Sequence, residues 1–294
     1  MEFKEELKCR TEEIDAILKR HLPEEKGYQR TIFEAMNYSV LAGGKRLRPM
    51  LMWESYKLFG GTGKVIEPFM VAMEMIQTYS LVHDDLPALD NDEYRRGKKS
   101  THAEFGEAMG ILAGDALLNY AFEKAGEAFD IEVSASVARA LRVLAHKAGV
   151  YGMIGGQVVD VESEGKSISE DTLNFIHRKK CGALIEASMM VGAILAGATD
   201  AEVEAMEKIG GDVGLAFQIQ DDILDVTSTD KELGKPVGSD DKNNKSTYVG
   251  FVGLDAARQE VERLSNRAIG ELQALKYKND FLVELIRMLI YRKK

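Results

Sequence analysis

Apolar residues recur every three or four positions along most of this chain, a spacing that places them on one face of an α-helix. The clearest run extends from Val203 to Leu224, and Thr199 or Asp200 fits the N-cap of that helix. The two-residue alternation that is typical of half-buried strands does not occur along the sequence. We therefore expect an all-α fold.

The same spacing predicts helices over most of the sequence. Their expected ranges are 2–22, 29–41, 50–58, 66–85, 107–128, 133–149, 256–275 and 280–291, with a long helix that starts at Ser169 and continues through Cys181 toward residue 196. Polar stretches at 43–49, 89–101 and 227–245 interrupt them. The third is long for a loop inside a compact domain, and its lysines favour a lid. With no repeat and no low-complexity linker, we expect one domain over residues 1–294.

Composition narrows the class of protein. Of the 294 residues, 45% are apolar, which is enough for a packed core, and only five are prolines. The net charge of −10 argues against nucleic acid as a partner. Cys9 and Cys181 give no disulfide framework and indicate a reducing compartment. The longest apolar stretch is too short to span a bilayer, so we expect a cytoplasmic protein with no stable membrane insertion.

Two acidic clusters in apolar surroundings carry the strongest chemical signal. The first comprises Asp84, Asp85 and Asp90, and the second comprises Asp221, Asp222 and Asp225. Buried carboxylates need a compensating cation, and oxygen ligands without histidine or cysteine suit Mg²⁺. Asp221 and Asp225 share a helix face, whereas Asp84 and Asp90 come together only if the helix breaks at Pro87. Either cluster alone also fits a solvated helix end, but both together predict several Mg²⁺ ions held against a polyphosphate.

Basic residues gather in three short groups, which explains how an acidic protein could bind such an anion. They are Lys45, Arg46 and Arg48 in the first polar stretch, Arg95, Arg96, Lys98 and Lys99 in the second, and Lys235, Lys242 and Lys245 in the third. The guanidinium fork binds phosphate oxygens in pairs, while lysine supplies a compact charge. Any one group fits a solvated turn equally well.

Taken together, these segments resemble the short-chain trans-prenyl diphosphate synthases, most closely the bacterial farnesyl diphosphate synthases. The resemblance covers nearly the whole chain and depends on segments 43–49, 83–97, 155–157 with Asp160, 180–181, 217–225 and 234–248. It implies a terpenoid synthase fold, with ten or more helices around a deep central cavity, and a homodimer. It also implies head-to-tail condensation of isopentenyl diphosphate with dimethylallyl and geranyl diphosphate, through an ionised allylic cation, to give farnesyl diphosphate.

The resemblance further implies roles for individual residues. About three Mg²⁺ ions, or Mn²⁺ in their place, would bind Asp84, Asp85, Asp90, Asp221 and Asp225. The allylic diphosphate would contact Arg95, Lys180, Lys235 and Lys245, and isopentenyl diphosphate would contact Lys45, Arg48 and Arg96. Gln77 would bind substrate by a hydrogen bond to phosphate. Gln218 and the backbone at Cys181 would face the developing cation. The aspartates other than Asp225, with Lys180, Lys235 and Gln218, are then the expected catalytic residues.

Three positions bear on how closely the chain follows this pattern. Gln77 stands where bacterial relatives often have histidine, and Cys181 stands where threonine is usual. Tyr79, with Ser80 beside it, precedes Asp84 by five residues, about 7.5 Å along a helix. An aromatic residue there marks farnesyl producers in the family, because its ring would end the tunnel for the growing chain. A helix-packing role for Tyr79 is the alternative.

Other functions stay open at this point. Within the class, geranylgeranyl or geranyl diphosphate is the alternative product. A terpene cyclase also ionises a diphosphate, but it would not need the second diphosphate pocket of Lys45, Arg48 and Arg96. A non-catalytic partner subunit would be expected to have lost one acidic cluster, and this chain has both.

Overall fold

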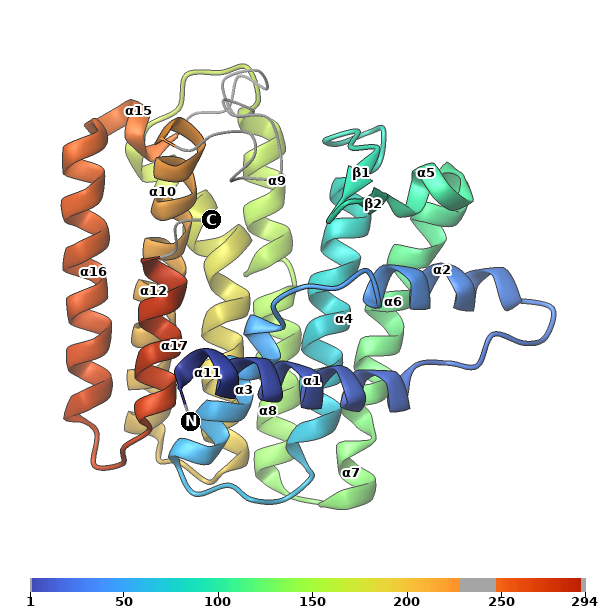
Figure 1. Ribbon diagram of the computed structural model, residues 1–294, viewed down its shortest axis with the longest axis horizontal. Helices are drawn as coiled ribbons and strands as arrows, with labels where there is room; N and C mark the ends of the chain where they lie inside the picture. Colours follow the sequence, from blue (N-terminus) through green and yellow to red (C-terminus); the bar gives the residue numbers. More distant parts are fainter. Residues whose placement is uncertain (1, 228–246, 292–294) are drawn as a thin grey trace. The chain divides into compact units, whose positions relative to one another are not determined.

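The structure is a computed structural model that describes residues 2–227 and 247–291 (Figure 1). Helices make up most of the described chain, which confirms the all-α expectation. The residues cluster into two compact units, 1–53 with 63–141 and 54–62 with 142–294, and each unit is described separately below. The expectation of a single domain stays a prediction.

The first unit is organised around α4 (Ile66–Asp84), which packs most extensively against α6 (Glu107–Gly126). Phe69, Met73 and Ile76 of α4 are completely buried, and apolar residues cover this helix on every side, as is typical of a core helix. The other helices of this unit are α1 (Phe3–His21), α2 (Arg30–Val40), α5 (Thr101–Phe105), α7 (Ala128–Ile131), and the first parts of α3 (Leu47–Leu58) and α8 (Ala135–Ala148).

A short antiparallel hairpin follows α4. It pairs β1 (Tyr94–Arg95) with β2 (Lys98–Lys99), and Arg96 and Gly97 form the turn with φ of 54° and 76°. Two consecutive residues with positive φ are typical of the tight two-residue loops that connect the strands of a β-hairpin. Strands of two residues are too short to give an alternating pattern, which is why the sequence did not predict them.

The second unit is organised around α12 (Asp200–Thr227), which packs against α11 (Ala183–Leu195) and α16 (Leu254–Ala274). Thr199 caps α12 as expected: the Glu202 backbone N–H donates to its hydroxyl, and its own N–H donates to the Glu202 carboxylate. The remaining helices of this unit are α9 (Met153–Ser163), α10 (Glu170–Ile176), the π-helix η1 (His177–Gly182), α15 (Tyr248–Val252) and α17 (Asp280–Ile290).

Most expected helices are confirmed with ends that differ by a few residues. The long helix expected from Ser169 starts at the right place, since the Thr172 N–H donates to the Ser169 hydroxyl. The expectation of one uninterrupted helix was wrong, because the π-helical turn η1 separates α10 from α11. Helices α5, α7, α9 and α15 were not expected. Neither Cys9 nor Cys181 forms a disulfide, and within the part of the chain that the structure describes no helix could cross a membrane.

Candidate active site

The first acidic cluster lies where α4 ends. The helix stops at Asp84, the Asp85 N–H still donates to Leu81 O, and the chain then turns so that the Asp90 N–H donates to Asp84 O at 2.9 Å. Pro87 lies in this turn, where it cannot continue the helix. The predicted break is therefore confirmed, and it returns the backbone of Asp90 to Asp84. Asp84 and Asp90 are half-buried, while Asp85 is 2% exposed.

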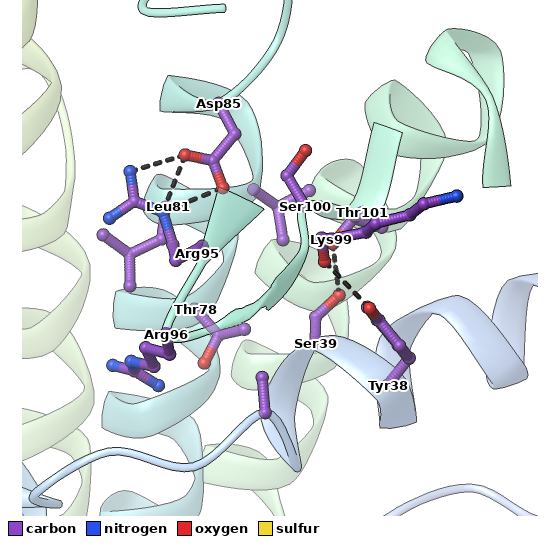
Figure 2. Close-up of a pocket in the computed structure, with 12 residues that line it drawn as sticks. Tyr38, Ser39, Thr78, Leu81, Asp85, Arg95, Arg96, Lys99, Ser100 and Thr101 are labelled. Atoms are coloured by element: carbon purple, nitrogen blue, oxygen red, sulfur yellow. Dashed lines mark hydrogen bonds and ion pairs between the residues drawn. The ribbon is translucent and has the colours of Figure 1, made fainter. Parts of the chain in front are cut away.

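Arg95, on the hairpin, pairs with Asp85. Its Nε lies 2.6 Å and 2.8 Å from the two carboxylate oxygens, and Nη2 lies 2.5 Å from Oδ1 (Figure 2). Burial raises the pKa of Asp85, although the hydrogen bond and charge of Arg95 act in the opposite direction. Burial alone would lower the pKa of Arg95, but the bonds to Asp85 outweigh it and the pKa is raised. Arg95 thus offsets only part of the cost of burying the Asp85 charge, and a further cation would favour the ionised form of this carboxylate.

The donors at these positions suit Mg²⁺. Within residues 2–227 and 247–291, no three histidine, cysteine, aspartate or glutamate side chains gather into a metal-binding group. Mg²⁺ rarely needs such a cage, because it takes one or two carboxylates and completes its shell with water and substrate phosphate oxygens. The oxygen donors of Asp84, Asp85 and Asp90 fit that mode of binding.

Arg96 brings the hairpin against the loop that precedes α3. Its Nη1 donates to Gly43 O, and a Cβ added to Gly44 would lie 2.8 Å from the Arg96 guanidinium carbon. Glycine at 44, with φ of 133°, is therefore needed both for its backbone angle and for the approach of this cation. Lys45 is exposed and Arg48 is half-buried in the first turn of α3. The structure thus brings Arg96 to the loop that carries Lys45 and Arg48.

Arg95 and Arg96 also line a small cavity in the first unit (Figure 2). Other lining residues include Thr78, Ser100 and Thr101, and its volume is about 30 Å³. That volume holds roughly one or two waters, so the cavity is too small for a diphosphate. Tyr38 closes one side by donating to Lys99 O at 2.8 Å.

The residues expected to limit chain length lie on α4. Tyr79 is 6% exposed, its ring meets the His83 ring edge-on at 5.8 Å, and burial raises its pKa to about 12. Its hydroxyl has no hydrogen-bond partner among the residues that the structure describes. The ring is therefore held by packing, including the edge-on contact with His83, and not by a hydrogen bond. Ser80 Oγ donates to Gln77 O at 3.0 Å, and Gln77 is half-buried.

In the second unit, Lys180 and Cys181 lie in η1. Lys180 Nζ is 2.6 Å from Asp160 Oδ2 of α9, and Cys181 is half-buried. A Cβ added to Gly156 would lie 2.2 Å from Lys180 N, and one added to Gly214 would lie 2.6 Å from Gly182 Cα. The two glycines thus allow α9 and α12 to close on the π-helix. Single-turn π segments often occur at functional sites.

The second acidic cluster occupies the last turns of α12. Asp225 is 4% exposed and Asp221 is half-buried. Asp222 accepts the Tyr248 N–H at 2.7 Å, and the Gln218 amide donates to its other oxygen at 3.5 Å. His177 Nε2 lies 3.8 Å from Asp222 Oδ2. The carboxylate of Asp222 is therefore engaged within the protein by Tyr248 and Gln218. Lys235 and Lys245 lie outside the described residues.

A larger cavity in the second unit is a poor candidate for the active site. It has a volume of about 680 Å³ and is lined by Arg178, Glu186, Glu204, Glu207, Lys208, Gly211, Asp212, Arg267 and Glu271. Five carboxylates against three cations would repel a diphosphate. None of the predicted site residues lines it.

Sequence reasoning missed two buried polar residues beside the predicted ones. Arg46 is 3% exposed between Lys45 and Arg48, and His177 is 6% exposed at the start of η1. The sequence showed Arg46 only as one member of a basic group. His177 has no second histidine at a spacing typical of metal sites, so it gave no signal. The position of Arg46 between Lys45 and Arg48 is the one sequence signal that could have indicated a buried side chain.

Comparison with known proteins decides the family. Residues 29–285 match the family model described as polyprenyl synthetase. The chain is 43% identical over 249 residues to farnesyl diphosphate synthase of Geobacillus stearothermophilus, covering 84% of each chain. It is 44% identical over 264 residues to geranylgeranyl diphosphate synthase of Cyanophora paradoxa, covering 90% of this chain and 87% of that one. The chain belongs to the polyprenyl synthetase family.

A solved structure agrees with this assignment. The geranyltransferase of Helicobacter pylori, complexed with magnesium and isoprenyl diphosphate, superposes with a TM-score of 0.85, with 30% identity over 99% of this chain and 97% of that one. The fold is thus that of the terpenoid synthases, as expected. Membership in the polyprenyl synthetase family makes the chain a trans-prenyl diphosphate synthase, which is a prenyltransferase, and favours that class over a cyclase. Relatives named for farnesyl and for geranylgeranyl products both occur at this level of identity.

Proposed function

We propose that this chain is a Mg²⁺-dependent farnesyl diphosphate synthase. It condenses isopentenyl diphosphate with dimethylallyl diphosphate and then with geranyl diphosphate. The observation that carries the proposal is the hairpin of the first unit, where Arg95 pairs with the acidic turn and Arg96, the next residue, meets the cationic loop. Two adjacent arginines, one beside the acidic turn and one beside the cationic loop, are what an enzyme that binds two diphosphates would need.

The acidic residues would hold the metal ions and, through them, the allylic diphosphate. Asp84, Asp85 and Asp90 supply oxygen donors on one turn of the first unit, and Asp221 and Asp225 would hold a further ion on α12. The magnesium in the geranyltransferase of Helicobacter pylori supports this choice of metal. When bound, Mg²⁺ neutralises the diphosphate oxygens as a Lewis acid.

The charged side chains of the protein would stabilise the leaving diphosphate and orient the second substrate. Breaking the bond between the allylic carbon and the diphosphate oxygen leaves the electron pair on that oxygen, and Arg95 and Lys180 stabilise the charge there. Lys45, Arg48, Arg96 and Gln77 orient isopentenyl diphosphate, whose double bond attacks the allylic carbon. A proton then leaves the new cation for the departed diphosphate. Gln218 and the Cys181 backbone would face the cation, and Lys235 and Lys245 would complete the allylic site.

Product length would depend on Tyr79. Its buried ring lies about 7.5 Å, or five helical residues, before Asp84. A growing chain whose diphosphate is held near Asp84 would meet this ring. Because a relative named for a geranylgeranyl product is as similar as one named for a farnesyl product, a longer product is the main alternative.

The test is incubation with isopentenyl diphosphate and dimethylallyl or geranyl diphosphate, with Mg²⁺ or with EDTA. We expect coupled product with both starters and at least a hundredfold loss with EDTA, restored by Mg²⁺ and in part by Mn²⁺. Activity that persists in EDTA would contradict the role of the metal. Light scattering under the same conditions tests the proposed homodimer, whose mass should be about twice the 32.6 kDa of one chain.

A further inference from the structure

Arg46 adopts a strained backbone in the loop between α2 and α3. Its φ is 49°, and only Arg46, Asn91 and Arg96 have positive φ among the non-glycine residues that the structure describes. A side chain with a Cβ is disfavoured in this region. The conformation therefore persists only where surrounding contacts hold it.

The guanidinium of Arg46 supplies those contacts. Nε donates to Asp15 Oδ1 of α1 at 2.8 Å, Nη1 donates to Glu74 Oε1 of α4 at 2.5 Å, and Nη2 donates to Val40 O at the end of α2 at 2.8 Å. The side chains of Arg46 and Glu74 are 2% and 4% exposed, and that of Asp15 is 37% exposed. Burial alone would lower the pKa of Arg46, but Glu74 and Asp15 outweigh it and the pKa is raised. The charged fork thus joins three helices of the first unit to the loop.

Arg46 cannot itself meet a substrate, because its side chain is enclosed and all three nitrogens of the fork are engaged within the protein. Its neighbours can. Lys45 is exposed on one side of the strained residue, and Arg48 lies in the first turn of α3 on the other. Arg96 contacts the same loop through Gly43 O and the open face of Gly44. The backbone angle at Arg46 therefore determines how Lys45 and Arg48, which flank it, are oriented relative to each other.

We propose that Arg46 is a positioning residue for the second diphosphate pocket. Its ion pairs with Asp15 and Glu74 hold the left-handed turn that presents Lys45 and Arg48 beside Arg96. This inference rests on the proposed function and deepens it, because it names what arranges the isopentenyl diphosphate site. A purely structural Arg46 would contribute to stability without favouring either substrate.

The test compares Arg46→Lys with two further variants. Lysine keeps the charge but loses the fork, so we expect the KM for isopentenyl diphosphate to rise about tenfold, while kcat and the KM for geranyl diphosphate stay within about threefold. Asp15→Asn removes only the partly exposed ion pair, and we expect a rise of about threefold in the same KM. Arg267→Lys is the matched control, since Arg267 forks onto Asp212 in the second unit at 2.5 Å through both nitrogens. It should lower the Tm and leave that KM unchanged.

Calorimetric titration of each folded variant with isopentenyl diphosphate provides a readout that does not need turnover. We expect the Kd to follow the KM. If Arg46→Lys does not fold, Asp15→Asn decides the question by the same two measurements. A lower Tm with an unchanged Kd and KM in both variants would overturn the positioning role and leave the proposed function intact. Wild-type protein that binds no isopentenyl diphosphate would overturn both.

Discussion

The polar residues of this protein differ in whether their side-chain atoms have hydrogen-bond partners within the protein. Asp85 and Arg95 satisfy each other, and Arg46 uses its whole fork. Tyr79 differs, because its buried hydroxyl has no partner in the described part of the chain. A polar atom left unpaired in the interior is costly, so any stabilisation from Tyr79 comes from its ring and not from its hydroxyl.

This difference yields a prediction about product length. Tyr79→Ala removes the ring and should shift the main product from farnesyl to longer diphosphates. Tyr79→Phe keeps the ring and removes only an unpartnered buried hydroxyl, so it should keep the product and raise the free energy of unfolding by about 1–3 kcal/mol. Both products are measured by mass after dephosphorylation. Unchanged length in Tyr79→Ala would show that the ring does not limit growth.

His177 gives a prediction about pH. Burial lowers its pKa to about 4, against a smaller opposing effect of Asp160, while the pKa of the same side chain in the unfolded chain stays near its ordinary value of 6.5. Between these values the unfolded state binds the extra proton, so the histidine's contribution to stability is present above pH 6.5 and is lost as the pH falls toward 4.

The variant His177→Gln has no such group and provides the comparison. Urea unfolding at pH 7 and pH 5 should show that the wild type loses about 2 kcal/mol more than the variant, since each pKa unit is worth about 1.4 kcal/mol. An equal loss in the two proteins would mean that His177 is not buried in its neutral form.

At the scale of elements, periodicity predicted the long helices well, and tertiary contacts explain what it missed. The capped start of α12 and the break of α4 at Pro87 follow from local chemistry. The π-helix does not, because it depends on Gly156 of α9 and Gly214 of α12, which are distant in sequence. The inward turn of Arg46 depends likewise on Asp15 and Glu74.

Two glycine substitutions test the packing of the π-helix. Gly214→Ala places a methyl group 2.6 Å from Gly182 Cα, backbone that cannot rotate away, and should destabilise the fold by about 1–3 kcal/mol and lower kcat. Gly270→Ala on α16 meets nothing within 4 Å and should stabilise the fold by about 0.5–1 kcal/mol through helix propensity. Denaturant unfolding measures both. A neutral Gly214→Ala would contradict the close contact of α12 with η1.

For the whole molecule, the sequence was sufficient for the fold class and the family, because the acidic and basic groups occur in a specific order. It was not sufficient for product length, since relatives named for two products are equally similar. A chain with a net charge of −10 nevertheless places Arg95, Arg96, Lys45 and Arg48 in one region of its first unit. Local cations rather than overall charge therefore favour an anionic substrate.

The most direct test of the account is the mass of the product made from geranyl and isopentenyl diphosphate with Mg²⁺. The account predicts a linear fifteen-carbon diphosphate as the main product, detected as farnesol after dephosphorylation. A twenty-carbon product would keep the class and reject the proposed chain length. A cyclised hydrocarbon, or no coupled product from folded protein, would contradict the central claim.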